Sequence, residues 1–232
     1  MSDGYHLVVF DWDGTLLDSI GAIVGCTRAV LDELGLPQVE ESKIRGVIGL
    51  GLRETVEALN PGCDEDTFWQ VVSSYRRLWL GHFCSTPVLF DGVEELLETL
   101  RERGLLLAVA TAKGRGGLDH DLERTGLGSF FGTSRTVDEA PSKPDPQMLL
   151  DILEELSIAR EAAVMVGDTV HDLTMAANAG VDAVGVVSGT QPRALLEKAK
   201  PVACLESVRE LSDWLAQAGD NTVCTDLADG SG

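Results

Sequence analysis

Two aspartates, Asp11 and Asp13, end a short apolar run at residues 8–10 and are followed at once by Gly14 and Thr15. On an extended strand the side chains of residues i and i+2 leave the same face, so both carboxylates would project from the end of that strand. The carboxyl ends of the strands in an open parallel sheet are where ligands bind. Two carboxylates this close repel each other unless a proton or a cation separates them. The pattern favours a chemical site over an ordinary Asp-Gly turn.

The chain after residue 87 alternates between apolar strands and helices, which indicates a parallel sheet. Continuous apolar runs at 105–110, 162–166 and 183–187 are typical of strands buried on both faces. Shorter strands are expected at 131–136 and near residue 202. The predicted fold class is therefore α/β, with a Rossmann-like three-layer core built on a parallel sheet.

Residues 18–86 show no alternating strand pattern. Apolar residues recur there at spacings of three and four, which predicts helices near 18–33, 40–48, 52–59 and 64–82. We call this segment the helical block. The expected organisation is a catalytic core at 1–17 and 87–218, the helical block at 18–86, and a polar, mobile C-terminal tail at 219–232.

The composition limits which partners the protein can have. The formal net charge is −20, so most of the surface repels nucleic acid and anionic membranes. Any anion site must be built locally from a metal, a few Lys or Arg side chains and helix N-termini. Five scattered cysteines without Cys-x-x-Cys spacing argue against a disulfide framework or a zinc site. With no signal peptide and no membrane-spanning run, we expect a cytoplasmic protein.

Further residues with catalytic potential follow later strands or lie in loops that can reach their ends. They are Thr111, Lys143 between two prolines, Asp168 and Asp172. Together with the Asp-x-Asp-Gly-Thr sequence at 11–15, they resemble the four motifs of the haloacid dehalogenase-like phosphohydrolases, in order, and the resemblance extends over residues 5–216. It implies that Asp11 is a nucleophile that takes a phosphoryl group and that Asp13 is the general acid and base.

The resemblance also assigns the remaining site residues. Thr111 donates to a phosphate oxygen, and Lys143 neutralises the nucleophile and the phosphoryl group. Mg²⁺ is the implied cofactor, held by the Asp11 and Asp168 carboxylates and the Asp13 carbonyl. Asp172 lies outside these ligands or reaches the metal through water, and it is also placed to cap the next helix. Relatives often carry Asn after the Thr; here it is Ala112, which leaves only its backbone for phosphate.

In this family a small helical cap follows the first motif, closes over the active site and recognises the substrate. We therefore expect the helical block to be that cap. The candidate substrate-binding residues are Arg45, Gly49, Gly51, Arg53, Thr111, Ala112 and Lys113. Arg53 and Arg45 are the preferred arginines, and the sequence does not decide between them; Arg76 and Arg77 are alternative anion contacts.

The function implied is a Mg²⁺-dependent phosphatase, a monomer or weak homodimer, acting on a small phosphorylated metabolite. Within the family it most resembles the phosphoglycolate phosphatase type, given the cap position and Thr111-Ala112-Lys113. A pyrophosphatase-like activity, a sugar-phosphate mutase of the beta-phosphoglucomutase type and a non-catalytic phosphate-binding protein are alternatives. A haloacid dehalogenase is disfavoured, because dehalogenases lack the second aspartate and the metal site.

Overall fold

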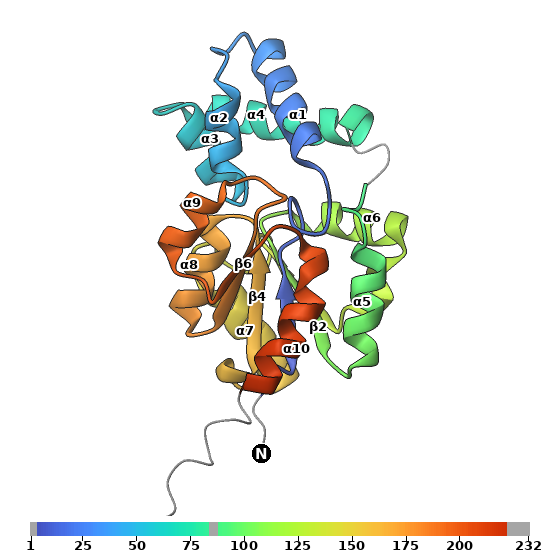
Figure 1. Ribbon diagram of the computed structural model, residues 1–232. Helices are drawn as coiled ribbons and strands as arrows, with labels where there is room; N and C mark the ends of the chain where they lie inside the picture. The colour runs from blue at the N-terminus through green and yellow to red at the C-terminus, as the bar shows by residue number, and fades with distance from the viewer. Residues whose placement is uncertain (1–3, 84–87, 222–232) are drawn as a thin grey trace, which may run out of the picture.

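The computed structural model describes residues 4–83 and 88–221, and its centre is a sheet of six parallel strands (Figure 1). The strand order is β3-β2-β1-β4-β5-β6. Their bounds are β1 Leu7–Phe10, β2 Leu106–Thr111, β3 Thr133–Thr136, β4 Ala163–Gly167, β5 Asp182–Val186 and β6 Ala203–Leu205. This confirms the predicted α/β fold with a parallel sheet. β1, which carries the first motif, lies near the middle of the sheet, between β2 and β4.

Helices cover both faces of the sheet because the side chains of each strand alternate between them. On β1, Val8 and Phe10 pack toward α5, α6 and α10, whereas Leu7 and Val9 pack toward α7, α8 and α9. These helices are α5 Val93–Glu102, α6 Arg115–Thr125, α7 Gln147–Leu156, α8 Val170–Ala179, α9 Arg193–Leu196 and α10 Leu211–Asn221. Four 3₁₀ turns join them, at Leu127–Phe130, Arg160–Ala162, Glu197–Ala199 and Val208–Glu210. The result is a three-layer core.

The described part of the helical block contains helices and no regular strand, as predicted. It consists of α1 Ile20–Glu33, α2 Glu41–Val47, α3 Leu52–Leu59, α4 Glu65–Leu78 and a π-helical turn at Trp79–Phe83. Two apolar clusters of its own hold it together, one around Phe68 of α4 and one around Ile44 of α2. Figure 1 shows the block beyond the end of the sheet toward which β1 runs.

The two connections between the helical block and the sheet lie side by side. The Asp18 amide donates to the Val88 carbonyl at 2.7 Å, and the Phe90 amide donates to the Leu16 carbonyl at 3.0 Å. Backbone hydrogen bonds therefore join the exit and the return of the chain at the edge of the site.

Two boundaries differ from the sequence prediction. The predicted helix at 64–82 changes at Trp79 from an α-helix to a π-helical turn. The predicted tail begins at residue 219, but α10 continues to Asn221, because an established helix propagates more easily than it starts. The rest of the predicted tail, 222–232, lies outside the described residues. Among those that are described, no helix has the length and apolar character needed to cross a membrane.

Candidate active site

Lys143 and Asp11 form a buried ion pair at the carboxyl end of β1. The Lys143 Nζ lies 2.5 Å from Asp11 Oδ1 and 2.5 Å from Asp172 Oδ1, and all three side chains are buried. Lys143 comes from the loop between β3 and α7, and Asp172 from the first turn of α8. Burial by itself lowers the pKa of Lys143, but the two carboxylates raise it above its usual value. The ammonium is therefore charged and fixed between two acidic groups.

Asp168 follows β4 and lies beside Asp11. The Thr15 hydroxyl lies 3.2 Å from Asp168 Oδ1 and 3.4 Å from Asp11 Oδ2, so it links the two carboxylates. The Thr190 amide donates to Asp168 Oδ2 at 2.6 Å. Gly14 has a φ of +92°, and a Cβ atom there would collide with the Asp168 carboxylate. Only glycine allows the turn after β1 to pass this close to the second acidic residue.

Asp11, Asp168 and Asp172 form a cluster suited to a divalent cation. Each offers an oxygen, these oxygens all lie within 4.8 Å of one another, and all three residues are buried. Burial and the neighbouring carboxylate of Asp172 raise the pKa of Asp168 to about 6. The pKa of Asp11 is well above its usual value because burial outweighs the charge of Lys143. Such a set of buried carboxylate oxygens is what hard cations such as Mg²⁺ prefer.

Asp172 is already committed to protein partners. Its Oδ2 accepts from the Thr169 hydroxyl at 2.7 Å and from the Thr169 amide at 3.0 Å, which completes a capping box on α8. Its Oδ1 faces Lys143. Within the cluster, Asp11 and Asp168 are therefore the carboxylates best placed to bind a cation directly, and Asp172 positions Lys143.

Asp13 interacts with a second network. Its Oδ1 accepts from the Ser19 hydroxyl at 2.7 Å and lies 3.0 Å from Lys113 Nζ. The same ammonium lies 3.3 Å from Asp121 of α6, whose carboxylate also accepts from the Trp12 indole. Burial by itself lowers the pKa of Lys113, but Asp13 and Asp121 together raise it. Asp13 is thus held by a charged partner distinct from the one that holds Asp11.

Thr111 ends β2 and is buried beside Ala112. Its hydroxyl oxygen accepts from the Lys113 amide at 3.1 Å, so its own proton is available to a ligand. Thr111, Ala112 and Lys113 all line a cavity, together with Asp11 and Asp13. The structure thus brings together the core residues that the sequence identified as catalytic or substrate-binding.

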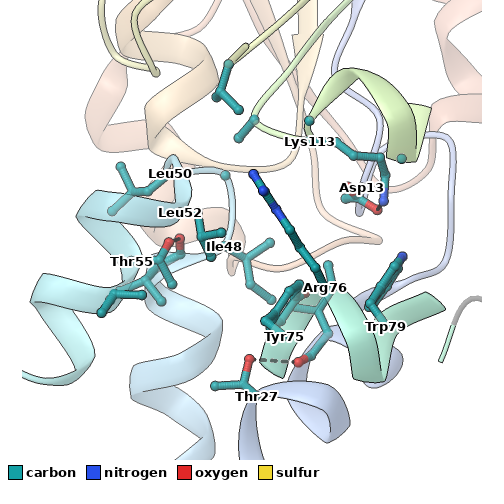
Figure 2. Close-up of a pocket in the computed structure, with 18 of the residues that line it drawn as sticks. Asp13, Thr27, Ile48, Leu50, Leu52, Thr55, Tyr75, Arg76, Trp79 and Lys113 are labelled. Carbon is teal, nitrogen blue, oxygen red and sulfur yellow. Dashed lines mark hydrogen bonds and ion pairs between the residues drawn. The ribbon is translucent and has the colours of Figure 1, made fainter. Parts of the chain in front are cut away.

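The cavity has a volume of about 610 Å³ and lies between the carboxyl edge of the sheet and the helical block. Its walls include Gly49 and Arg76. Figure 2 shows the Arg76 side chain extending from α4 into the cavity, with Lys113 and Asp13 close together on its other side. One of the alternative arginines therefore faces the catalytic groups from the helical block.

The two arginines preferred from the sequence do not line this cavity. Arg45 pairs with Glu41 at 3.0 Å, one helical turn away in α2. Arg53 pairs with Glu65 at 3.0 Å and stacks over the Phe68 ring. These ion pairs turn both guanidinium groups onto the outside of the helical block.

Gly51 contacts the core without lining the cavity. Its amide donates to Ser142 Oγ at 2.6 Å, next to Lys143. The glycine-rich connection at 49–51 therefore joins the helical block to the loop that carries Lys143.

Ser19, Asp121 and Thr190 were not predicted from the sequence as site residues. Thr190 could have been found from its position, because it follows β5 at the same edge as the motifs. Ser19 and Asp121 carry no comparable signal, since each lies at a helix position where a polar residue is common. Only the packing of α1 and α6 against the turn after β1 identifies them.

Comparison with known families agrees with this geometry. The family model described as haloacid dehalogenase-like hydrolase matches residues 8–186. A probable phosphatase, IndB, of Dickeya dadantii is 34% identical, covering 88% of this chain and 91% of the relative. The pyrophosphatase PpaX of Bacillus velezensis is 31% identical, and the match covers 88% of this chain and 93% of the relative. A phosphoglycolate phosphatase of Nitrosococcus oceani is 28% identical, and the match covers 92% of this chain and 97% of the relative. The resemblance inferred from the motifs is confirmed.

Solved structures share the whole fold. A Clostridium acetobutylicum protein described as a predicted phosphatase has a TM-score of 0.84 and 26% identity, and the match covers 93% of this chain and all of that one. A Bacteroides vulgatus protein assigned as a beta-phosphoglucomutase has a TM-score of 0.82 at 19% identity, covering 94% of this chain and 91% of that one, which shows a shared fold alone.

Proposed function

Because this chain belongs to the haloacid dehalogenase-like hydrolases, we propose that it is a Mg²⁺-dependent phosphatase that transfers the phosphoryl group of a small metabolite to Asp11 and then to water. The enzyme class is phosphoric monoester hydrolase, in agreement with its phosphatase relatives. The observation that carries the proposal is the buried Asp11–Lys143 pair, 2.5 Å long, at a strand end that opens into the cavity.

Asp11 is the nucleophile. One of its oxygens attacks phosphorus, the bond from phosphorus to the ester oxygen breaks, and the electron pair leaves on that oxygen. Lys143 lowers the repulsion between the carboxylate and the incoming phosphate, and Asp172 keeps the ammonium in place. The Thr111 hydroxyl donates to a phosphoryl oxygen.

Asp13 is the general acid and base. It protonates the departing ester oxygen and later takes a proton from the water that hydrolyses the acyl phosphate on Asp11. Its contacts with Ser19 and Lys113 support this role, because they hold the carboxylate at the wall of the cavity and off the Lys143 ammonium.

Asp11 and Asp168 would hold the metal, and the Asp13 carbonyl remains the third ligand expected from the family. When bound, Mg²⁺ supplies positive charge that offsets the acidic cluster and the phosphate. The fit rests on three buried carboxylates whose oxygens lie within 4.8 Å of one another, with Lys143 in contact with Asp11 and Asp172. The helical block serves as the cap, because its Gly49 and Arg76 face the same cavity as the catalytic groups.

The test is phosphate release from a panel of phosphorylated compounds, with Mg²⁺ and with a chelator. The panel includes phosphoglycolate, sugar phosphates, nucleotides and pyrophosphate, and sugar phosphates are also analysed for isomerised product. We expect release that needs the metal and falls roughly 10⁴-fold or more in Asp11→Asn, as for other nucleophile replacements.

A matched control is Asp66→Asn on the exposed face of α4, which should release phosphate at the wild-type rate. Calorimetry should show that Asp11→Asn still binds phosphate. Full turnover by Asp11→Asn would contradict the nucleophile assignment, and isomerised sugar phosphate without release would favour the mutase alternative.

A further inference from the structure

The cavity extends well beyond the catalytic groups into the helical block. Its far wall is formed by apolar side chains of three helices: Val30, Leu31, Ile44, Val47, Val56 and Leu59 come from α1, α2 and α3. These same residues are buried in the block. The catalytic end and the apolar end therefore belong to one continuous space.

The apolar wall offers few hydrogen bonds to a ligand. Thr27 and Thr55 line it, but their hydroxyls donate to the carbonyls of Ile23 and Val47, at 2.9 and 3.4 Å. Figure 2 shows this hydrogen bond of the Thr27 hydroxyl, which stays within α1. Asn60, at the end of α3, is a further polar residue on this side, whereas the charged groups Asp13, Arg76 and Lys113 line the other end of the cavity.

Aromatic rings occupy the region between these two ends. Tyr75 and Trp79 stack with ring centroids 5.9 Å apart and an interplanar angle of 8°. Both line the cavity. Such rings bind apolar groups well and hold few rotamers, so they form a firm wall for a hydrophobic ligand.

The size of the space fits a larger occupant than a two- or three-carbon ester. A volume of about 610 Å³ is typical of sites that bury drug-sized ligands. A small, fully charged metabolite would fill only the end of this space beside Asp11 and Asp13 and would make few contacts with the apolar wall. The apolar wall belongs to the helical block, with Val71 and Tyr75 of α4 beside the residues of α1–α3, so movement of the block relative to the sheet would leave it intact.

We propose that the substrate is a phosphate monoester whose leaving group is a hydrophobic body of roughly six or more carbon atoms, seated among α1–α4 while the phosphate meets Asp11 at the end of β1. This proposal names the substrate class of the phosphatase proposed above and rests on that function. It gives the helical block a definite role, which is to recognise the leaving group by shape and apolar contact.

The experiment compares straight-chain alkyl phosphates from ethyl to octyl phosphate. Their leaving groups have nearly the same acidity, so a change in kcat/KM reports contacts with the chain. We expect kcat/KM to rise about fourfold for each methylene that is buried, until the cavity is full. Binding of the matching alkylphosphonates, which cannot be hydrolysed, is measured by calorimetry and should follow the same trend.

Two neighbouring valines of α4 provide a matched pair of variants. Both are buried in the block, but Val71 lines the cavity and Val72 does not. In Val71→Phe the ratio of kcat/KM for hexyl over ethyl phosphate should fall toward one, while Val72→Phe keeps the wild-type ratio. Because the ratio is taken within one variant, it does not depend on the fraction of folded protein.

The outcomes separate this proposal from the proposed function. Hydrolysis that needs Asp11 but does not change with chain length would overturn the hydrophobic substrate and leave the phosphatase standing. Phosphonate binding that strengthens with chain length, without hydrolysis of any ester, would support the apolar site and overturn the phosphatase. Alkylphosphonate binding that does not change with chain length, together with no hydrolysis of any ester, would overturn both proposals.

Discussion

Arg76 is set apart from the other arginines of the helical block. Among the described residues, Arg28, Arg45, Arg53 and Arg77 each pair with a glutamate of the block. Arg76 has no such partner there and lines the cavity. Exposed ion pairs contribute little to stability, but the N–H groups of a paired guanidinium already have an acceptor. The position of the glutamates therefore leaves Arg76 free for an anionic ligand.

We predict that Arg76→Ala lowers kcat/KM roughly tenfold to a hundredfold, the range expected for losing a hydrogen bond to a charged group. The neighbouring Arg77→Ala is the control, because Arg77 binds Glu33 and does not line the cavity. It should stay within about twofold of wild type if exposed pairs matter as little as usual. Equal losses in the two variants would show that general charge, rather than a specific contact, is responsible.

At the scale of elements, Lys113 connects Asp13 to α6 and to the π-helical turn of the helical block. It follows β2, its ammonium lies 3.3 Å from Asp121 of α6, and it lies 4.9 Å from the ring centroid of Trp79 in the π-helical turn. The 3.0 Å contact with Asp13 links these elements to the turn after β1. The orientation of Asp13, the proposed general acid, thus depends on how α6 and the helical block pack.

We predict that Lys113→Met impairs hydrolysis of esters that need a general acid. With alkyl phosphates kcat should fall about a hundredfold, within the usual range for acid–base catalysis. With 4-nitrophenyl phosphate, whose leaving group needs no proton, the loss should be small. Lys113→Arg keeps the charge and should restore part of the activity on alkyl phosphates. An equal loss on both esters would mean that Lys113 supports the fold rather than Asp13.

At the scale of the whole molecule, the site concentrates the negative charge that the protein carries overall. The chain has 38 acidic and 18 basic residues, and the cluster of Asp11, Asp168 and Asp172 adds buried negative charge at its centre. Lys143 is the cation in contact with two of them. A metal that binds only the folded state would therefore stabilise the whole fold.

We predict that Mg²⁺ raises the Tm in a concentration-dependent way, with about 2.7 kcal/mol of stabilisation at a hundred times its Kd. That corresponds to roughly 5–10 °C for a protein of this size. Asp168→Asn should lose the response. Differential scanning calorimetry with and without Mg²⁺ measures this without using activity, and an unchanged response in Asp168→Asn would contradict the metal assignment.

The metal-free proteins should also differ. Burial raises the pKa of Asp168 to about 6, above its usual value, so at pH 7.5 its ionised form destabilises the folded state. Asp168→Asn without Mg²⁺ should then be at least as stable as wild type. As the pH falls below 6 the folded wild type takes up a proton, and the penalty shrinks progressively until the pH reaches the ordinary value of 3.8, so the gap between the two proteins should narrow over this range.

The sequence by itself determined the fold class of this protein and which core residues gather at its candidate site. Asp11, Thr111 and Asp168 each follow an apolar run, and the carboxyl ends of parallel strands meet at one edge, so local sequence was enough to predict that they converge. Only the tertiary structure decided which arginine faces the cavity, what holds Asp13, and how far the cavity enters the helical block. Periodicity reports the buried face of one helix, whereas these features depend on contacts between elements far apart in the chain, such as Arg77 with Glu33 or Lys113 with Asp13.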